Sequence, residues 1–388
     1  MSVFTQKIGV IGGGQLGKMM ILEAKKMGFY VTVLDPTEKC PCHSICDEHI
    51  IAGFDDRKAI RLLSSKSDVV TYEFEHIDYK ELLSLENEGK KIYPTAASLK
   101  IIQNKLTQKQ ALQKGNIPVA DFMLTKTAND IYTAGDKFGY PFILKTCTGG
   151  YDGKGNAFIK DKSHIKEAFE TLGGGTLPLM AERLVDFTME ISVLACRGLT
   201  GETKVYPVGD NRHINNILHK TIVPADISED TTKKAMELAG KVMEVFDGIG
   251  MFCVEMFVTK DNDVLVNEVA PRPHNSGHYS IEGCVTSQFE NHIRAITGIP
   301  LGNTSLIRPT VMVNLLGEEG TAGNAVITGA EKALRLDGVK LHIYGKEKSS
   351  PRRKMGHITV TADDISTALK YADKAFSEIK ITASGKEV

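Results

Sequence analysis

The sequence lacks an excess of charge of either sign. Its 388 residues include 47 lysine and arginine residues against 48 aspartate and glutamate residues, which leaves a formal net charge of −1. Proteins that bind nucleic acid through its phosphates usually concentrate positive charge, because each neutralised phosphate releases a counterion. The near balance therefore argues against nucleic acid as a main partner.

Long apolar runs are also missing. No stretch approaches the roughly 18 consecutive apolar residues that a membrane-spanning helix needs. The opening segment MSVFTQKIGV does not have the basic stretch followed by an apolar one that is typical of a secretory leader. We therefore expect a cytoplasmic protein without a membrane partner.

Cysteine is sparse, and seven is an odd number. Without a secretory leader, this count argues against a disulfide framework and predicts reduced thiols. One cluster, Cys40, Cys42 and Cys46 near His43 and His49, has the donor types of a metal site. Its spacing is not that of structural zinc, no second cysteine pair follows, and the proline within it indicates a turn, so a plain loop is favoured.

The length and a hydrophobic content of 42% are sufficient for two or three domains. Over about the first hundred residues, short apolar runs alternate with helix-period segments, which predicts a parallel sheet with helices on both faces. Between 118 and 185, predicted strands surround the glycine-rich loop TGGYDGKGN, and the segment from 186 to about 300 is richer in strand. The chain is thus expected to be a globular α/β protein.

The first glycine motif has the spacing Gly12-x-Gly14-x-x-Gly17 between a predicted strand and a predicted helix, and Asp35 ends the next strand. This pattern is typical of dinucleotide-binding proteins, in which amides at a helix N-terminus hold the pyrophosphate and the acid binds ribose. Alone it is weak evidence. A nicotinamide or flavin oxidoreductase stays an alternative, but it leaves the glycine-rich central region without a role.

A pair of carboxylates is predicted in a hairpin over 251–270. If residues 260–263 form a four-residue loop, Thr259 faces Val264 and Glu255 faces Glu268. Opposed residues share a face with Cβ atoms about 5 Å apart, and two like charges on apolar strands are unfavourable. A cation between them is the favoured explanation, and oxygen ligands suit magnesium, which usually binds together with phosphates. The alternative is an exposed hairpin with two solvated glutamates.

Positive charge accompanies this pair. Lys145 ends an apolar predicted strand and Lys105 begins a predicted helix, although either lysine alone could be a solvated charge at the end of its element. The segment GGYDGKG does not match the P-loop pattern. Its glycines would let the backbone approach an oxyanion closely, and Lys154 adds charge. The glycines concerned are Gly149, Gly150, Gly153 and Gly155.

Several segments together resemble the ATP-grasp family, and within it the branch that carboxylates aminoimidazole ribonucleotide in purine biosynthesis. They are TGGYDGKG, AERLV, TMEISV, EMFV, VNEVAPRPHNSGH and GKEKSSPRRKMGH, and the resemblance extends from Lys7 to about Val360. It implies an α/β fold class, an ATP-grasp fold preceded by a Rossmann-like parallel α/β domain. The implied divisions are 1–104 for the N-terminal domain, 118–185 for the lid subdomain, and 105–117 with 186–388 for the catalytic domain, including a small C-terminal portion over 305–388.

The resemblance also implies a ligase reaction. ATP, with magnesium, phosphorylates bicarbonate to carboxyphosphate, and the exocyclic amine of 5-aminoimidazole ribonucleotide captures the carboxyl group, which gives the carboxyamino product, ADP and phosphate. A glycine-rich lid is expected to close over the phosphates, because carboxyphosphate exposed to water would be lost. The family resemblance further suggests a homodimer.

Residue roles carry over by position for the nucleotide and the metal. Lys105 and Lys145 resemble the phosphate lysines, and Glu255 and Glu268 match the magnesium ligands, with Asn267 beside them. The remaining ATP residues are Gly150, Gly153, Lys154 and Gly155 in the lid loop, Glu182 and Val185 in an adenine linker that uses mainly backbone groups, Glu190 for the ribose hydroxyls, and His213 on the nucleotide side.

For the chemistry, Arg272 resembles the cation for bicarbonate or the transferred phosphoryl group, with His274 and Asn275 next to it. His274 could also be a core or turn histidine, and Lys354 a solvated charge. The implied catalytic group is Arg272, Lys346, Tyr151, Asp152 and His274. The implied ribonucleotide contacts are Gln15, Glu73, Tyr151, Asp152, Asn275, Lys346, Arg353 and Lys354, so the first glycine loop would line the acceptor side and bind no dinucleotide.

The sequence departs from the family pattern at three positions. Cys147 stands where a basic residue is expected, Asn104 where an acid is expected, and Asp210 where a glutamate is expected. The nearest rival is a formate-dependent glycinamide ribonucleotide transformylase, but Gln15 and the Tyr151-Asp152 pair favour the carboxylating branch. A catalytically dead regulator is a third alternative, against which the intact metal pair and lysines argue.

Overall fold

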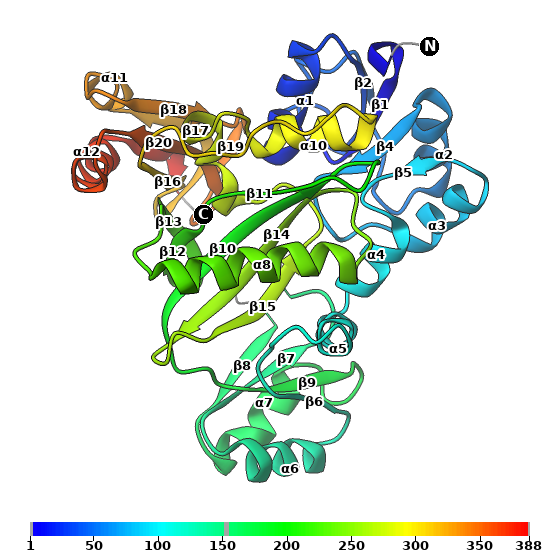
Figure 1. Ribbon diagram of the computed structural model, residues 1–388, viewed down its shortest axis with the longest axis vertical. Helices are drawn as coiled ribbons and strands as arrows, with labels where there is room; N and C mark the ends of the chain where they lie inside the picture. Colours follow the sequence, from blue (N-terminus) through cyan, green and yellow to red (C-terminus); the bar gives the residue numbers. More distant parts are fainter. Residues whose placement is uncertain (1–2, 151–154, 387–388) are drawn as a thin grey trace.

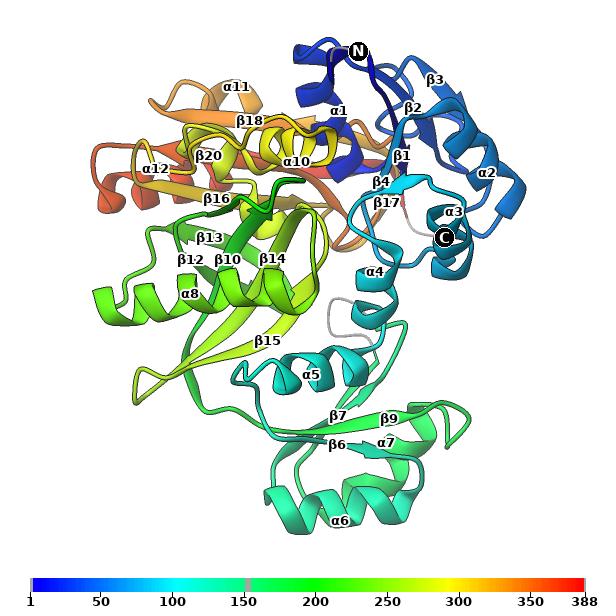
Figure 2. The same cartoon turned by 45° about the vertical axis from the view of Figure 1, so that its right-hand side comes forward.

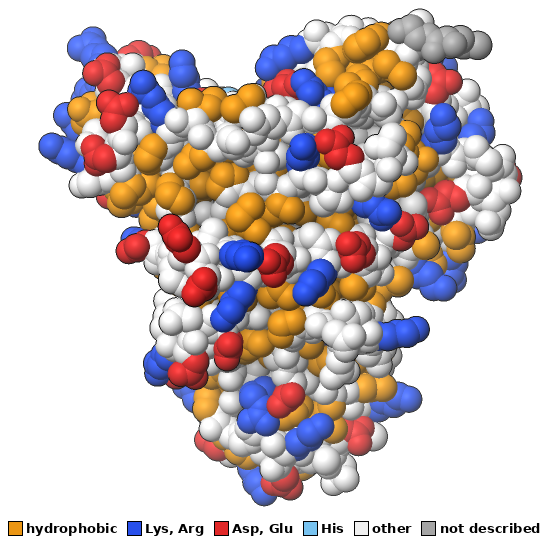
Figure 3. Space-filling view, viewed as in Figure 1, with side chains coloured by type: hydrophobic (Ala, Val, Ile, Leu, Met, Phe, Trp, Pro, Cys, Tyr) orange, Lys and Arg blue, Asp and Glu red, His pale blue; other side chains and the backbone are white. Residues whose placement is uncertain are grey.

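The computed structural model describes residues 3–150 and 155–386. The described chain forms three bodies: a parallel α/β domain at the N-terminus, a small antiparallel sheet with two helices, and a long central sheet that continues into the C-terminal part (Figures 1 and 2). None of the described helices combines the length and apolar character needed to span a bilayer. Both signs of charge are interspersed over the face seen in Figure 3.

The N-terminal domain is a five-stranded parallel sheet in the order β3-β2-β1-β4-β5, as the alternating pattern predicts. Side-chain caps begin α2, α3 and α4; Asp56, for example, accepts hydrogen bonds from the amides of Lys58 and Ala59. The elements are β1 (Lys7–Ile11), α1 (Gln15–Lys26), β2 (Tyr30–Leu34), β3 (Glu48–Ile50), α2 (Arg57–Lys66), β4 (Val69–Tyr72), α3 (Tyr79–Asn87), β5 (Lys91–Ile92) and α4 (Ala96–Ile102), after the short 3-10 turn η1 (Val3–Thr5).

The segment expected to be the lid subdomain, called by that name below, forms a four-stranded antiparallel sheet in the order β6-β9-β7-β8. Its two α-helices cover one face around a core that includes Ile131, Phe142 and Leu179, and the other face turns toward helix α5 and the central sheet (Figure 2). Helix α5 (Lys105–Lys114) precedes this subdomain, whose elements are β6 (Phe122–Thr125), α6 (Ala128–Phe138), β7 (Phe142–Thr146), β8 (Asn156–Ile159), η2 (Lys162–His164), α7 (Ile165–Thr171) and β9 (Leu179–Arg183).

The central sheet runs β15-β14-β10-β12-β13-β16-β20-β18, with β11 paired to β10. The C-terminal strands β16, β20 and β18 are therefore continuous with the strands between residues 187 and 270. Helix α8 packs on one face of β10 and β14, and α10 packs between this sheet and α1 of the N-terminal domain. The strands are β10 (Phe187–Arg197), β11 (Thr203–Val205), β12 (Gly209–Ile214), β13 (Ile217–Val223), β14 (Gly250–Thr259), β15 (Val264–Ala270), β16 (Thr310–Leu316), β18 (Val339–Ile343) and β20 (Lys354–Thr361).

A further small sheet, β19-β17-β21, lies beside the C-terminal strands. Helix α12 covers β16 and β20, where Ala368, Ala372 and Ala375 are buried. The remaining elements are α8 (Glu229–Val245), η3 (Asn275–Gly277), α9 (Ser280–Gly283), α10 (Gln288–Thr297), β17 (Thr321–Thr328), α11 (Ala330–Ala333), β19 (Lys348–Ser349), α12 (Ile365–Glu378) and β21 (Lys380–Lys386).

The β14–β15 hairpin corrects one expectation from the sequence. Thr259 donates its amide hydrogen to the carbonyl of Asp263 at 2.9 Å, so the loop contains three residues rather than four, and Asn262 at φ 61° makes the left-handed turn. Further along, Met256 pairs with Val266 and Glu255 pairs with Glu268. A β-bulge at Asn267 accounts for this shift, and the predicted opposition of the two glutamates is confirmed.

Candidate active site

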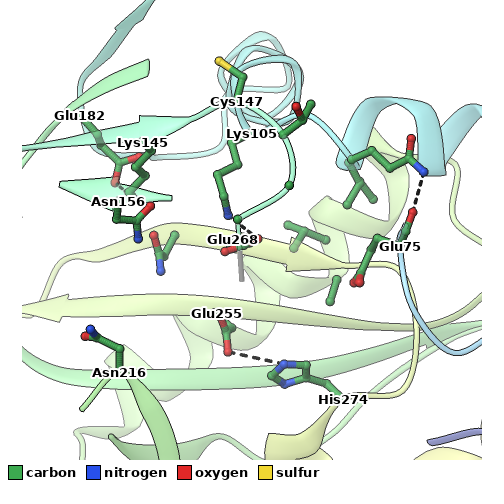
Figure 4. A pocket seen from close by; sticks show the side chains of 18 of the residues that line it. Glu75, Lys105, Lys145, Cys147, Asn156, Glu182, Asn216, Glu255, Glu268 and His274 are labelled. Carbon is green, nitrogen blue, oxygen red and sulfur yellow. Dashed lines mark hydrogen bonds and ion pairs between the residues drawn. The ribbon is translucent and has the colours of Figure 1, made fainter. Parts of the chain in front are cut away.

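A cavity of about 770 Å³ lies between the lid sheet, helix α5 and the end of the central sheet. Its wall combines side chains from all three bodies (Figure 4). Lysines come from α5 and β7, carboxylates from β14 and β15, and a loop of the N-terminal domain contributes Glu75. Charged groups of both signs therefore converge in one partly enclosed space, which is the usual setting of an enzyme site.

Glu255 and Glu268 both line this cavity, and the bulge adds the side chain of Asn267. Burial and, to a smaller extent, the facing Glu268 carboxylate together raise the pKa of Glu255 to about 7. Burial also acts on Glu268, but the ammonium of Lys105, 2.8 Å from its Oε1 atom, outweighs burial and holds the pKa below its usual value. One of the two opposed carboxylates thus has a lysine partner, and the other has incomplete charge compensation.

Lys105 is the first residue of α5, and its position depends on the residue before it. The Asn104 side chain accepts hydrogen bonds from the amides of Leu106 and Thr107 at 3.0 and 3.2 Å, which caps the helix. Asn104 therefore provides the helix cap, although the family pattern has an acid at this position. Figure 4 shows the Lys105 side chain extending from this helix end toward Glu268.

Lys145 and Glu182 come from neighbouring lid strands and lie side by side in Figure 4. The Lys145 Nζ atom is 3.0 Å from Glu182 Oε1. A second lysine, Lys109, lies 3.3 Å from the other oxygen of Glu182. Sequence reasoning missed Lys109, although its spacing of four residues from Lys105 places both on one face of α5.

The residues expected to bind the nucleoside lie at one end of the cavity. His213 Nδ1 is 2.8 Å from Glu190 Oε2, and although burial lowers the pKa of His213, the Glu190 carboxylate raises it above its usual value overall. Val185, in the stretch after β9, also lines the cavity, beside the stacked rings of Phe187 and Phe257, whose centroids are 4.6 Å apart. Apolar and polar side chains thus line the cavity together here, and this set of residues is called the half-apolar slot below.

The lid loop is described only in part. Gly150 lines the cavity, and Gly155, at φ 78°, accepts a hydrogen bond from the amide of Thr146 at 2.8 Å. Asn156, which sequence reasoning missed, lines the cavity next to it. The expected site residues Tyr151, Asp152, Gly153 and Lys154 lie outside the described residues.

Arg272 follows β15 and lines the cavity next to the N-terminal domain. Its Nε atom is 2.8 Å from Oε1 of Glu75, and the backbone carbonyl of Glu75 accepts a hydrogen bond from the side-chain Nε2 of Gln103 at 2.5 Å. This ion pair connects the parallel domain to the central sheet at the site. Sequence reasoning named Glu73 in the segment TYEFE, whereas Glu75 is the residue of that segment that lines the cavity.

His274 and Asn275 occupy the start of the 3-10 turn η3. His274 Nε2 is 3.9 Å from Glu255 Oε1, and Nδ1 is 2.9 Å from Ser276 Oγ. Burial and the nearby Arg272 hold the pKa of His274 well below its usual value, so the ring is neutral at pH 7. Asn275 is buried in a reciprocal amide pair with Asn314, at 2.9 and 2.7 Å. His274 therefore both caps a turn and faces the cavity.

The first glycine loop is closed by the chain's own carboxylates. Glu73 accepts hydrogen bonds from the amides of Gly14 at 2.5 Å and Gly17 at 2.7 Å, and Asp35 accepts one from Gly13 at 2.8 Å. These amides are the ones that would hold a pyrophosphate. The dinucleotide interpretation of this motif is therefore wrong for this fold.

Only part of the expected ribonucleotide set lines the main cavity. Of the described members, Lys354 and Asn275 line the cavity, whereas Gln15, Glu73, Lys346 and Arg353 do not. Lys346 donates a hydrogen bond to the Lys354 carbonyl at 2.8 Å. Burial lowers the pKa of Lys346 to about 8, as does the nearby Arg353, while Glu73 opposes the shift. A group of basic residues thus adjoins the cavity beside α1.

Cys147 and Asp210 have structural surroundings that explain how the chain accommodates them. The Cys147 carbonyl accepts a hydrogen bond from the Lys105 amide at 2.8 Å, and burial raises the pKa of its thiol to about 11, so it adds no charge to the site. Asp210 is buried and its carboxylate is 3.2 Å from Nε of Arg212. Among the described residues, no hydrogen bond or ion pair joins Cys147 or Asp210 to Glu255 or Glu268.

The cysteine cluster is a buried turn against the first glycine loop. Cys40 and Cys42 are buried, and the Cys42 thiol donates to the Gly14 carbonyl at 3.6 Å. All seven cysteines are free thiols. Within residues 3–150 and 155–386, no group of three or more histidine, cysteine, aspartate or glutamate side chains is arranged to hold a metal ion by itself.

Comparison with known families agrees with this architecture along most of the chain. Residues 5–103 match the ribonucleotide synthetase preATP-grasp domain, residues 110–289 the ATP-grasp domain, and residues 310–371 the phosphoribosylaminoimidazole carboxylase C-terminal domain. The class is therefore established: the chain is a ligase of the ATP-grasp type.

Individual relatives narrow the assignment. The chain is 46% identical to N5-carboxyaminoimidazole ribonucleotide synthase of Bacillus subtilis (strain 168), over 91% of this chain and 90% of that protein, and 43% identical to the enzyme of Staphylococcus aureus (strain COL), over 93% and 94%. It belongs to the N5-carboxyaminoimidazole ribonucleotide synthase family.

Solved structures of similar proteins agree with this assignment. The crystal structure of the Thermotoga maritima synthetase matches with a TM-score of 0.90 and 46% identity, over 98% of this chain and all (100%) of that one. The Aspergillus clavatus synthase in complex with ADP and 5-aminoimidazole ribonucleotide matches with a TM-score of 0.89 and 36% identity, over 97% and 99%. The expected fold class is therefore confirmed.

Proposed function

We propose that this chain uses ATP and bicarbonate to carboxylate the exocyclic amine of 5-aminoimidazole ribonucleotide, in purine biosynthesis. The observation that carries the proposal is the convergence of Lys105, Lys145 and Arg272 with the Glu255–Glu268 pair in one cavity. All three substrates are anions, so their reaction needs concentrated positive charge. The relatives, by their names and by the ADP and ribonucleotide of one solved structure, support the same reaction.

The proposed nucleotide site extends from the apolar slot to the lysines. The backbone of the stretch from Glu182 to Val185 would bind adenine, Glu190 and His213 would bind the ribose side, and Lys105 and Lys145 would bind phosphate oxygens. The glycines and Lys154 of the lid loop would complete the phosphate contacts. The half-apolar slot beside Phe187 and Phe257 supports this direction, because an adenine ring favours apolar walls and a triphosphate favours lysines.

The carboxylate pair fits a magnesium ion. Its donors are carboxylate and amide oxygens, which hard cations prefer, and the raised pKa of Glu255 reports a buried negative charge without full compensation. Glu255 and Glu268 would hold the ion, with Asn267 beside them, and the bound ion would neutralise charge on the triphosphate. Nucleotide oxygens would complete its coordination, since magnesium commonly takes few protein ligands.

In the proposed reaction, an oxygen of bicarbonate attacks the terminal phosphorus of ATP and ADP leaves. Arg272, oriented by Glu75, would hold bicarbonate and the transferred phosphoryl group through its fork of donors. The amine nitrogen then bonds to the carboxyl carbon, phosphate leaves and the amine gives up a proton. The neutral ring of His274, beside Arg272, accepts the Ser276 amide at Nδ1, so its Nε2–H group, on the side of Glu255, is able to donate a hydrogen bond in this step.

The acceptor would bind where the basic group adjoins the cavity. Lys346, Arg353 and Lys354 would hold its phosphate, with Gln15, Glu73, Asn275, Tyr151 and Asp152 as further contacts. In this arrangement the closed glycine loop acts as a wall of the acceptor site. Beyond the site, we propose the domain division given by the sequence, a homodimer, and action in the cytoplasm; light scattering of the purified chain tests the dimer.

The decisive experiment measures ADP release. We expect release that requires magnesium, bicarbonate and 5-aminoimidazole ribonucleotide together, with product detected by its acid-labile carboxyl group. Equal turnover with formate and glycinamide ribonucleotide would instead assign the chain to the transformylase branch. Fluorescence titration with NADH is the control for the oxidoreductase alternative, and we expect no saturable binding at micromolar cofactor.

A further inference from the structure

Helix α5 carries two lysines one turn apart that have different surroundings. Lys105 keeps 18% of its side chain exposed and lies 2.8 Å from Glu268. Lys109 keeps 3% exposed, lies 3.3 Å from Glu182 Oε2 and donates a hydrogen bond to the backbone carbonyl of Val266 at 3.2 Å. Lys109 is therefore enclosed between α5, the lid strand β9 and the metal-pair strand β15, and it has no direct route to a ligand in the cavity.

The Glu182 carboxylate is shared by two lysines. Its side chain is 3% exposed, with Lys145 at 3.0 Å from one oxygen and Lys109 at 3.3 Å from the other. Lys145 retains 13% exposure and lines the cavity, so it can reach a bound nucleotide. A buried carboxylate that lost its only counterion would be strongly unfavourable. Lys145 can thus leave Glu182 only if another cation stays with that carboxylate.

The position of Lys109 is fixed independently of the lid. The neighbouring Gln108 side chain donates to the carbonyl of Val269 and accepts from its amide, both at 3.0 Å, which attaches α5 to strand β15. Lys109 itself is hydrogen-bonded to the same strand through Val266. Lys109 therefore keeps its place beside the central sheet when Lys145 leaves Glu182 for a nucleotide.

We propose that Lys109 is a positioning residue for nucleotide binding: as the resident counterion of Glu182, it frees Lys145 to bind the nucleotide phosphates. The inference rests on the proposed phosphate role of Lys145. Removing the Lys109 charge leaves Lys145 as the sole partner of a buried carboxylate and draws it away from the nucleotide. Neutralising both Lys109 and Glu182 removes that competition, and Lys145 becomes available again.

The test compares MgADP dissociation constants by isothermal titration calorimetry in the full chain. Lys109→Met is expected to weaken MgADP binding by about tenfold or more, whereas the ribonucleotide KM stays within about twofold. The double variant Lys109→Met/Glu182→Gln is expected to bind MgADP within about threefold of wild type. The unchanged KM for the ribonucleotide distinguishes this effect from a general loss of structure in Lys109→Met.

The matched control is Lys114→Met, at the exposed end of the same helix, which should bind MgADP as wild type does. Wild-type affinity in Lys109→Met, or a double variant at least as weak as the single one, would overturn the inference. If the single variant does not fold, the double variant decides alone: binding within about threefold of wild type supports the inference, and weaker binding overturns it.

Lys145→Met separates this inference from the proposed function. If that variant binds MgADP as tightly as wild type, the phosphate role of Lys145 is wrong, and the inference is overturned with it. If Lys145→Met weakens binding but Lys109→Met does not, only the positioning role is overturned. In a Glu182→Gln background, which leaves no buried carboxylate unpaired, adding Lys109→Met to Lys145→Met should cause no further loss of MgADP affinity, because Lys109 acts through Glu182 and Lys145.

Discussion

Glu255 lies directly opposite Glu268 in the antiparallel pair of β14 and β15. The opposition results from two local features that compensate: a three-residue loop that ends in the left-handed Asn262, and a bulge at Asn267. Because the bulge re-aims one strand, it also brings Asn267 into the cavity wall. The two carboxylates and the amide therefore form one oxygen-rich surface against the predicted phosphate lysines.

Substitution of Glu268 tests the metal proposal. Glu268→Gln keeps the shape but removes a charge that faces both Lys105 and the proposed magnesium ion. We expect turnover to fall by about a hundredfold or more, with partial recovery at high magnesium concentration. The control is Asp261→Asn at the exposed tip of the same hairpin. Wild-type turnover of Glu268→Gln at ordinary magnesium concentration would remove the metal argument.

Substitution of Arg353 tests the acceptor site. Arg353 is exposed, and its guanidinium donates to the Lys348 carbonyl at 2.6 Å, which leaves further donors for a phosphate. Arg353→Ala should raise the KM for the ribonucleotide by about tenfold or more and change the KM for ATP little. The adjacent Arg352, which pairs with Glu319, is the matched control as Arg352→Ala. An unchanged acceptor KM would place the phosphate elsewhere.

The pH dependence of acceptor use follows from Lys346. Burial lowers its pKa to about 8, and a lysine is charged below its pKa. The positive charge that attracts the acceptor phosphate is therefore present at pH 7 and is lost as the pH rises through about 8. We expect kcat/KM for the ribonucleotide to fall above that pH, since this ratio reports the free enzyme. Lys346→Arg should move the fall to higher pH; a fall at the same pH would exclude Lys346 as its origin.

Buried histidines should make the fold sensitive to acid. Burial lowers the pKa of His292 to about 3, and it holds those of His278 and His357 well below the usual value. Below pH 6.5 the unfolded chain binds protons that the folded chain does not, so stability is lost as the pH falls. Each such histidine should cost about 2 kcal/mol at pH 5. Melting temperatures between pH 7.5 and 5 measure the total loss.

The single variant His292→Gln checks this assignment residue by residue. His292 accepts a hydrogen bond from the Met251 amide at 3.1 Å, so the variant should be less stable at pH 7.5. Its stability should nevertheless fall less steeply on acidification than that of wild type, because one titrating group is gone. An unchanged slope would show that His292 does not contribute to acid sensitivity.

Sequence patterns predicted the local structure well because that structure depends on near neighbours. The apolar runs at β1, β2 and β4 became a parallel sheet, and the helix expected to begin at Lys105 begins there. The same patterns misjudged the hairpin loop by one residue, since the αL preference of an asparagine and a bulge are small local choices that strand periodicity does not register.

Long-range partners were outside the reach of sequence reasoning. The segment TYEFE contains two glutamates, and only the fold shows that Glu73 closes the glycine loop while Glu75 meets Arg272 across the cavity. In the sequence, nothing distinguishes Lys109 from the other lysines of α5. Its contacts with β9 and β15 appear only in the folded structure. In both cases the decisive contact joins residues far apart in the chain.

By itself, the sequence determined the order of strands and helices, the glycine positions and the residue types that mark the ligase family, because these depend on local periodicity and on short motifs. Only the tertiary structure decided which charges face each other and which backbone amides are hydrogen-bonded to carboxylates of the chain itself. The physical reason is that burial and pairing set the energy of a charge, and both depend on segments that are distant in the chain and adjacent only after folding.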